Sequence, residues 1–582
     1  MHSNLPLEAF EPLFEPDQYS DTDTWHLAPF FTNLDSSVFV PLIFSPELIG
    51  ALCSRASRAT RDLRHIYLNE FIYPFVSPTR TEKDSEESWK EKVAYGKELK
   101  WFIDFIREHP LTEVFSNPRA RSFYVTWLAQ YGDDSIAQMA GMHLGFASIS
   151  QVAIKHPEDQ RIGLAPIEKS SRYVNFGQKV KGHYVYYTDP TLESLGLKEE
   201  YERAMDGLFS RYNELIPKLS AWLAKKFSEE KPGVVEKKAF DTLRGLLPMS
   251  TLSQVAFFGN GQAFEYMITR SLGHSLGEIR WMATRSKEEL AKLAPSFFRR
   301  LDETDAEKKK LLSEYQEYLA GRGRRASPFV EEFFGAKKGV VGGEMKFGPT
   351  KAEVRLIEHD PEGENKVITG MLYSAPNMRV AWSEIFERVK RMSGAEKEKI
   401  VAAYMEGRSK RFHKAGRAFE NAYVRFEVVM NNGAWRDLQR HRMLTQQRQL
   451  FTCVHGFDIP PEVTEAGLEA EFKEPIMGAE EVFAKIASRD LELAQYAVTM
   501  AHRIQFMQWE NTRQCFWELE LRSIPEGHPD YRVVEQEKFR QLEKVYPLIS
   551  KYMLVNMGEY DFARRGQEEK IQKKAEELLK NL

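Results

Sequence analysis

Three consecutive basic side chains in the second half of the chain have the chemistry to bind phosphate. Arg440, His441 and Arg442 follow residues 431–438, where an Asn-Asn-Gly start and apolar residues at helical spacing predict a short helix. An arginine fork holds phosphate oxygens through charge-assisted hydrogen bonds of roughly 1.5–3 kcal/mol each. In the alternative interpretation, the three side chains only complement the dipole at a helix C-terminus. The polar residues 445–449 that follow favour a nucleotide-binding loop.

A second candidate site lies in the first half, where four functional groups fall within one short segment. Glu168, Ser170, Arg172 and Tyr173 supply a carboxylate, a hydroxyl, a guanidinium and a phenol. Such a loop binds phosphate through the arginine and backbone N–H groups, while the tyrosine packs or stacks. Ser135, upstream in a polar turn, is a typical helix N-cap residue. Serine-rich loops are common, so this string alone does not separate a binding loop from a surface loop.

Two long amphipathic helices are predicted to position these segments, one in each half. The first is marked by the apolar residues Tyr201, Met205, Leu208, Phe209, Tyr212 and Leu215. The second is marked by Val482, Phe483, Ile486, Leu493, Tyr496 and Met500. Each helix is soon followed by an arginine, an asparagine and another arginine, which are Arg244, Asn260 and Arg270 in the first half and Arg503, Asn511 and Arg522 in the second. The order predicts a diverged internal duplication, although salt bridges between helices would also explain single arginines.

A change of composition separates the two halves. Residues 308–351 are rich in Gly, Arg and Lys, which is typical of a solvated linker. A strand-like segment, residues 354–357, restarts the ordered chain. The sequence therefore predicts an acidic N-terminal leader (1–35), a first domain (36–307), the linker (308–351), a second domain (352–563) and a charged helical tail (564–582). We call the two domains the first copy and the second copy.

Composition limits the function classes. The 582 residues carry 81 basic and 85 acidic side chains, a net charge of −4 that gives no general case for nucleic-acid binding. The three cysteines are widely spaced, so neither a disulfide framework nor a metal site is expected. The chain has no run of about 18 apolar residues and no leader with the pattern of a secretory signal. These features predict a cytoplasmic protein without a membrane partner.

Taken together, the motifs resemble those of the flavin-dependent thymidylate synthases. That family carries Arg-His-Arg, then a loop with Glu-x-Ser-x-Arg-Tyr, and further downstream Arg, Asn and a final Arg. The second copy matches the Arg-His-Arg at residues 440–442, but residues 448–453 do not match the loop motif. The first copy matches the loop motif in full at residues 168–173, but Asp159-Gln160-Arg161 replaces Arg-His-Arg, one residue out of register. Each copy thus lacks the motif that the other copy retains.

The resemblance implies an α+β fold of two tandem thymidylate-synthase-complementing-like domains, each a mixed sheet flanked by long helices. It implies methylation of dUMP to dTMP with FAD as cofactor, and with NADPH and methylenetetrahydrofolate as co-substrates. Catalytic roles would fall to Arg270, Arg522 and Ser170. Flavin binding would fall to Arg440, His441, Arg442, Ser135, Glu168, Asn260 and Asn511. Binding of dUMP would fall to Arg172, Tyr173, Arg244 and Arg503.

In this family the site is shared between the subunits of a homotetramer. The resemblance therefore implies a homodimer that forms a pseudo-tetramer, in which the first copy supplies the nucleotide loop and the second supplies the Arg-His-Arg. Two alternatives stay open. One is a flavoenzyme of the same fold that acts on another pyrimidine-like substrate. The other is a non-catalytic nucleotide-binding scaffold, or a nucleic-acid-binding protein that uses the Arg-rich linker.

Overall fold

Two compact units make up the chain. The computed structural model describes residues 5–82, 84–109, 117–122, 135–301, 304–334 and 353–560. Contacts group Met1–Met345 with Pro460–Thr499 in the first unit, and Lys346–Ile459 with Met500–Leu582 in the second. Part of the predicted second copy, residues 460–499, therefore belongs to the first unit. The predicted tail, 564–582, lies outside the described residues.

Each unit contains a four-stranded sheet, and the two sheets have the same strand order. In the first unit the order is β1 (Val38–Phe39), β2 (Gly141–Ser150), β6 (Leu252–Asn260) and β3 (Leu164–Glu168). In the second it is β7 (Glu353–His359), β8 (Tyr423–Asn431), β10 (Arg503–Asn511) and β9 (Thr445–Arg448). The common order and the helix-rich α+β class confirm the predicted tandem duplication. All pairs in these two sheets are antiparallel, in place of the expected mixed strand directions.

Alternating apolar residues explain why the central strands form. In β8, Val424, Phe426, Val428 and Met430 are buried, while the residues between them are more exposed. Because successive side chains of a strand point to opposite faces, this pattern puts one face of the sheet against the core. A helix begins directly after each central strand: α9 (Gln151–Glu158) and α13 (Gly261–Leu272) in the first unit, α19 (Asn432–Leu438) and α23 (Thr512–Arg522) in the second.

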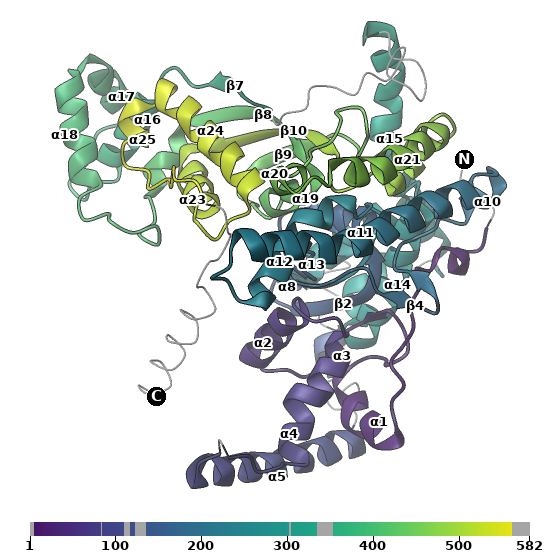
Figure 1. Cartoon of the computed structure of the whole chain (residues 1–582). Coiled ribbons are helices and arrows are strands. Elements are labelled where there is room, and N and C mark those ends of the chain that lie inside the picture. The colour runs from purple at the N-terminus through teal and green to yellow at the C-terminus, as the bar shows by residue number, and fades with distance from the viewer. Residues whose placement is uncertain are drawn as a thin grey trace. The chain divides into compact units, whose positions relative to one another are not determined.

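The two predicted long helices lie side by side within the first unit (Figure 1). Helix α11 (Lys198–Lys226) buries the predicted apolar face. Helix α21 (Glu469–Ala487) begins and ends earlier in the chain than expected. The chain turns after Ala487, and Asp490 caps a new helix, α22 (Leu491–Ala494), so the prediction that one helix continues to Met500 is wrong. Opposite charges join the antiparallel pair, with Arg211 2.7 Å from Glu474 and Lys485 2.7 Å from Glu200.

Two segments that were expected to be irregular contain ordered structure. Residues 308–334 of the predicted linker belong to helix α15 (Ala306–Phe334), and residues 335–352 lie outside the described part. Within the predicted leader, η1 (Leu7–Phe10) buries the Phe10 ring against Gly277. Helix α1 (Asp21–Leu27) begins with a capping box in which Ser20 and Asp23 satisfy each other's backbone N–H groups. Local capping and one buried aromatic ring order this acidic segment.

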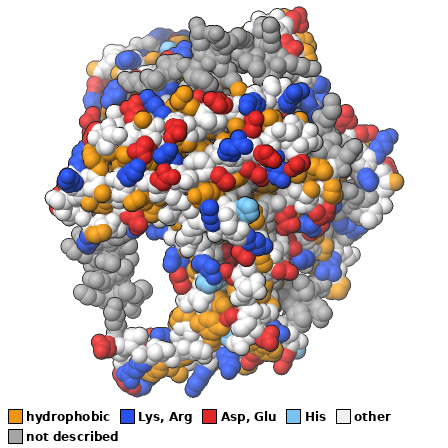
Figure 2. Space-filling view, turned by 45° about the vertical axis from the view of Figure 1, so that its right-hand side comes forward, with side chains coloured by type: hydrophobic (Ala, Val, Ile, Leu, Met, Phe, Trp, Pro, Cys, Tyr) orange, Lys and Arg blue, Asp and Glu red, His pale blue; other side chains and the backbone are white. Residues whose placement is uncertain are grey.

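The other helices complete the two units. They are α2 (Pro46–Ala56), α3 (Leu63–Ile66), α4 (Tyr73–Val76), α5 (Glu86–Glu108), α8 (Ser135–Gln138), α10 (Thr191–Ser194), α12 (Pro232–Leu243), α14 (Gly277–Leu293), α16 (Gly363–Tyr373), α17 (Trp382–Arg391), α18 (Gly394–Tyr404), α20 (Pro461–Glu465), α24 (Pro529–Val545) and α25 (Pro547–Ser550). On the face shown in Figure 2, basic and acidic side chains are interspersed, as the near-balanced charge leads one to expect. No helix of the described residues is long and apolar enough to cross a membrane.

Candidate active site

Strand register aligns the two copies residue by residue. Gly141 pairs with Asn260 at the end of β6, and Tyr423 pairs with Asn511 at the end of β10, so β6 and β10 are equivalent. The short helices η4 (Arg244–Leu246) and η7 (Gln495–Ala497) precede these strands at the same distance. Arg244 is therefore equivalent to Gln495, and Arg503 begins the strand. The first arginines of the two predicted Arg, Asn, Arg sets do not occupy equivalent positions.

The degenerate and intact Arg-His-Arg segments occupy equivalent positions. Ser150 and Asn431 cap α9 and α19, and the two segments follow these caps at the same distance. In the first copy Gln160 donates from Nε2 to the carbonyl of Ala263 at 3.0 Å. In the second copy His441 lies 3.2 Å from the side chain of Gln514, the equivalent of Ala263. The one-residue offset therefore arises after Gln160, where Arg161 and Gly163 have φ angles of 62° and 85°.

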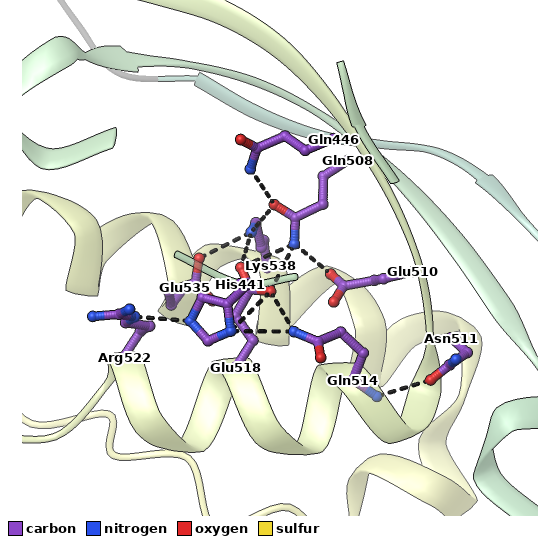
Figure 3. A network of polar contacts seen from close by, with 10 residues as sticks. All are labelled: His441, Gln446, Gln508, Glu510, Asn511, Gln514, Glu518, Arg522, Glu535 and Lys538. Carbon is purple, nitrogen blue, oxygen red and sulfur yellow. Dashed lines mark hydrogen bonds and ion pairs between the residues drawn. The ribbon is translucent and has the colours of Figure 1, made fainter. Parts of the chain in front are cut away.

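His441 is a buried, neutral hydrogen-bond acceptor. The Nε–H of Arg522 donates to His441 Nε2 at 2.8 Å (Figure 3). Because a guanidinium only donates, the neutral imidazole carries its hydrogen on Nδ1, which lies 3.9 Å from the Glu518 carboxylate. The Gln514 amide nitrogen, 3.2 Å from Nδ1, is itself a donor and does not accept this hydrogen. Burial, together with the charges of Arg522 and Lys538, lowers the pKa of His441 to about 4. The structure thus brings together two of the predicted site residues, His441 and Arg522.

The flanking arginines of the motif differ in exposure. Arg442 is exposed and Arg440 is half-buried, and each makes polar contacts. In the first copy, Arg270 occupies the last turn of α13, as Arg522 does in α23. Arg270, however, donates from Nη2 to the main-chain carbonyl of His156. Only the second copy therefore couples this arginine to a motif histidine.

A buried cluster with two guanidiniums and one carboxylate stands behind the loop of the first copy. Arg172 binds Asp241 through two hydrogen bonds, both of 3.0 Å, and Arg244 Nη1 lies 3.7 Å from the same carboxylate. All three side chains are at least nine-tenths buried. Guanidinium groups of this kind bind phosphate oxygens through charge-assisted hydrogen bonds. The structure thus joins the predicted Arg172 and Arg244, whereas the second copy has Thr452 and Gln495 at these positions.

The rest of the loop packs around this cluster. Ser170 Oγ accepts a hydrogen bond of 3.3 Å from the Arg172 N–H, and Tyr173 is half-buried. Glu168 is buried and lies 3.0 Å from Lys155 Nζ, which also binds Glu158 at 2.6 Å. This ion cluster fixes the base of the loop. Ser135 begins α8, a helix that packs against α13.

The Arg503 guanidinium binds a neighbouring loop of the same unit. Its Nε donates to Asp458 at 2.6 Å, and its two terminal nitrogens donate to the carbonyls of His455 and Phe457 at 3.1 and 2.9 Å. The side chain is almost completely buried. Arg503 therefore holds the 455–458 loop against the start of β10, and the structure does not bring it together with His441 or Arg522.

The two predicted asparagines are helix N-caps. Asn260 Oδ1 accepts from the Ala263 N–H at 2.8 Å, and Asn511 Oδ1 accepts from the Gln514 N–H at 2.9 Å. We expect Asn260→Ala and Asn511→Ala each to lower the free energy of unfolding by about 1 kcal/mol, because an orphan N–H loses its acceptor. Chemical denaturation measures this change. Serine replacements should restore most of the stability, and a loss of flavin affinity that serine fails to restore would reveal direct cofactor contact instead.

The first copy also encloses a cavity of about 950 Å³ next to its degenerate motif. Gln160 and Asn260 line it from one side, and α15 contributes Lys308 and Tyr315. Arg299, Arg300 and Tyr266 complete a lining with cationic and aromatic groups. Its size is at the upper end of ordinary ligand sites. Such a lining suits an anionic ligand with an aromatic ring.

Sequence reasoning missed the partners of the site residues. Asp241, Glu518 and Lys538 lie far along the chain from the residues that they contact. A signal was nevertheless present for two of them, since Glu518 and Lys538 fall on the buried faces of α23 and α24, where apolar residues are expected.

Comparison with known proteins agrees with this duplicated arrangement. A family model for the thymidylate synthase complementing proteins matches residues 82–296 and 355–548. The chain belongs to this family. Its members include flavin-dependent thymidylate synthases, and the two matched regions confirm the predicted tandem duplication. The protein is accordingly a thymidylate synthase-like enzyme.

Three relatives of this chain are UPF0159 proteins. A UPF0159 protein of Chlamydia muridarum is 32% identical over 566 residues, which cover 96% of this chain and 99% of the relative. A UPF0159 protein of Chlamydia pneumoniae is 34% identical over 552 residues, 93% and 96% of the two chains. One from Thermoplasma acidophilum is 29% identical, covering 77% and 92%. A solved structure, the UMP/dUMP methylase PolB of Streptomyces cacaoi bound with 5-Br dUMP, is 14% identical with a TM-score of 0.29, covering 35% of this chain and 94% of that one.

Proposed function

We propose that this family member is an FAD-dependent enzyme that methylates dUMP to dTMP, with methylenetetrahydrofolate as one-carbon donor and NADPH as reductant. The observation that carries the proposal is the complementary retention of polar groups. The first copy keeps the Arg172–Asp241–Arg244 cluster, and the second copy keeps His441 bonded to Arg522. Neither copy keeps both.

The first-copy cluster suits the nucleotide phosphate. The cluster places two guanidiniums behind the loop, and a phosphate dianion accepts bidentate hydrogen bonds from arginine. Ser170 and Tyr173 belong to the same loop and would contact the nucleotide. Arg503 has a weaker claim, because its guanidinium already donates to Asp458 and to two carbonyls.

The second-copy residues suit a flavin and an ionised pyrimidine. Arg440, His441 and Arg442 would hold the flavin, with Asn260 or Asn511, Ser135 and Glu168 as further contacts. A neutral His441 offers polar contact without adding charge, while Arg522 supplies positive charge that stabilises a pyrimidine anion. Bound FAD would supply the electron-transfer chemistry, which no side chain of this protein provides.

The proposal includes a homodimer in the cytoplasm that acts as a pseudo-tetramer. The deciding experiment is NADPH oxidation by the purified full chain with added FAD, with and without dUMP. We expect dUMP to change the rate, and Arg442→Ala to abolish that change. Flavin binding without any response to dUMP would favour another pyrimidine-like substrate. Failure to bind flavin would contradict the enzyme proposal and favour a nucleotide-binding scaffold.

A further inference from the structure

The second copy contains a buried ionic network that the first copy lacks. Lys538 Nζ lies 3.1 Å from Glu518 and 2.9 Å from Glu535, and Gln508 bonds to both Glu518 and Glu510 (Figure 3). We call these five residues the Lys538 network. All five are completely or almost completely buried. Among the described residues no group of acidic, His or Cys side chains is arranged to hold a metal ion, so the network has another role.

The same positions in the first copy are apolar or small. The equivalent strands, helix caps and helix starts identify them as Phe257, Gly259, Met267, Ala283 and Ser286. At these positions the second copy has four ionisable side chains and one amide, whereas the first copy folds with apolar or small residues. Burying charges is costly even when they are paired. The fold itself therefore does not require the Lys538 network.

The Lys538 network contains one ion pair, between Lys538 and Glu518. Burial alone would raise the pKa of Glu518, but the Lys538 ammonium, assisted by His441 and two glutamines, lowers it to about 2. Burial raises the pKa of Glu535 to about 7, and burial with the Glu518 charge raises the pKa of Glu510 well above its usual value. The core of the network is consequently an ionised Lys538–Glu518 pair.

The Glu518 carboxylate of this pair also faces the Arg-His-Arg motif. It lies 3.9 Å from His441 Nδ1, and Gln514 Nε2 donates to it at 3.1 Å. On the other side of the imidazole, Nε2 accepts from Arg522. The remaining contact of the Arg522 guanidinium with a carboxylate of the described residues is Asp437, 3.8 Å from Nη1. The orientation of Arg522 therefore depends on His441 Nε2 remaining an acceptor, and the negative charge of Glu518 favours this tautomer by attracting the hydrogen on Nδ1.

We propose that the Lys538–Glu518 pair is a positioning device for the second copy. It holds His441 in one tautomer, with Nε2 as acceptor, and thereby aims the Arg522 guanidinium at a planar anionic pyrimidine. The identity of that ligand rests on the proposed function, but the fixed tautomer does not. The first copy, with Ala263 in place of Gln514 and an apolar core behind it, has no such device.

The test removes the charge pair, which the first copy also lacks. Lys538→Met with Glu518→Met removes both charges together, and such replacements are often well tolerated. Glu535 loses its ammonium partner, which raises its pKa further and keeps it as a neutral carboxyl. We expect an unchanged melting temperature, a roughly 100-fold loss of kcat for dUMP-dependent NADPH oxidation, and a KM for dUMP changed by less than about 3-fold. A purely structural role predicts unchanged kcat. Lys218→Met with Glu471→Met, a half-exposed pair between α11 and α21, is the matched control and should change nothing.

A spectroscopic readout separates this inference from the proposed function. In the full chain with ¹⁵N-labelled histidine, His441 should show one tautomer in the wild type and averaged tautomers in the double variant, with His441→Gln used to assign the signal. Glu518→Gln, which keeps the side-chain size and removes the negative charge that faces Nδ1, should have the same effect if the double variant does not fold. A single tautomer in these variants overturns the inference, even if activity falls. Absence of dUMP-dependent turnover in the wild type overturns the proposed function but leaves the tautomer test intact.

Discussion

Arg522→Lys should lower dUMP-dependent NADPH oxidation by about 100-fold or more. Arginine donates to His441 from Nε while its terminal nitrogens stay available for a second partner. A lysine ammonium is a point charge on a flexible stem and does not reproduce this two-sided geometry. Removal of one preorganised donor to a developing anion typically costs 10²–10³ in kcat. Steady-state kinetics with varied dUMP measure the loss.

Arg270→Lys is the matched control in the first copy. Arg270 occupies the last turn of the equivalent helix, but it donates to the carbonyl of His156, and its copy has Gln160 in place of the motif histidine. We expect a rate within about 3-fold of the wild type, since lysine also donates to a single carbonyl. The reverse order of effects, with Arg270→Lys the more damaging, would assign the catalytic arginine to the first copy.

Arg172→Met should raise the KM for dUMP by about 10- to 100-fold, while kcat changes little. This range corresponds to one or two lost charge-assisted hydrogen bonds to a phosphate. The fold should persist because Arg244 still lies 3.7 Å from the Asp241 carboxylate and keeps it compensated. Kinetics with varied dUMP, together with equilibrium binding of dUMP, separate the affinity loss from a loss of chemistry.

Thr452→Met is the control at the equivalent position of the second copy. The Thr452 Oγ1 is buried without a hydrogen-bond partner among the described residues, so its replacement removes no polar contact. We expect an unchanged KM for this variant. If Arg172→Met also left the KM unchanged and only lowered stability, the Arg172–Asp241 pair would be a structural ion pair, and the nucleotide would bind elsewhere.

The sequence by itself determined the features that arise from local patterns. Apolar spacing predicted α11, and the extended segment at residues 354–357 lies within β7. The order of motifs in each half predicted the duplication and the family. The complementary loss of Arg-His-Arg and of Glu-x-Ser-x-Arg-Tyr was also visible, because a motif is a short run of side chains.

Only the tertiary structure decided the partners of these side chains. Asp241 meets Arg172, and Glu518 meets Lys538, across chain separations that local periodicity does not encode. Strand register decided that Gln160 is equivalent to His441 and that Arg244 is not equivalent to Arg503. The structure also showed that Asn260 and Asn511 cap the helices that follow them. The physical reason is that register and helix packing minimise the free energy of the whole core, so a residue's partner depends on segments far away in the sequence.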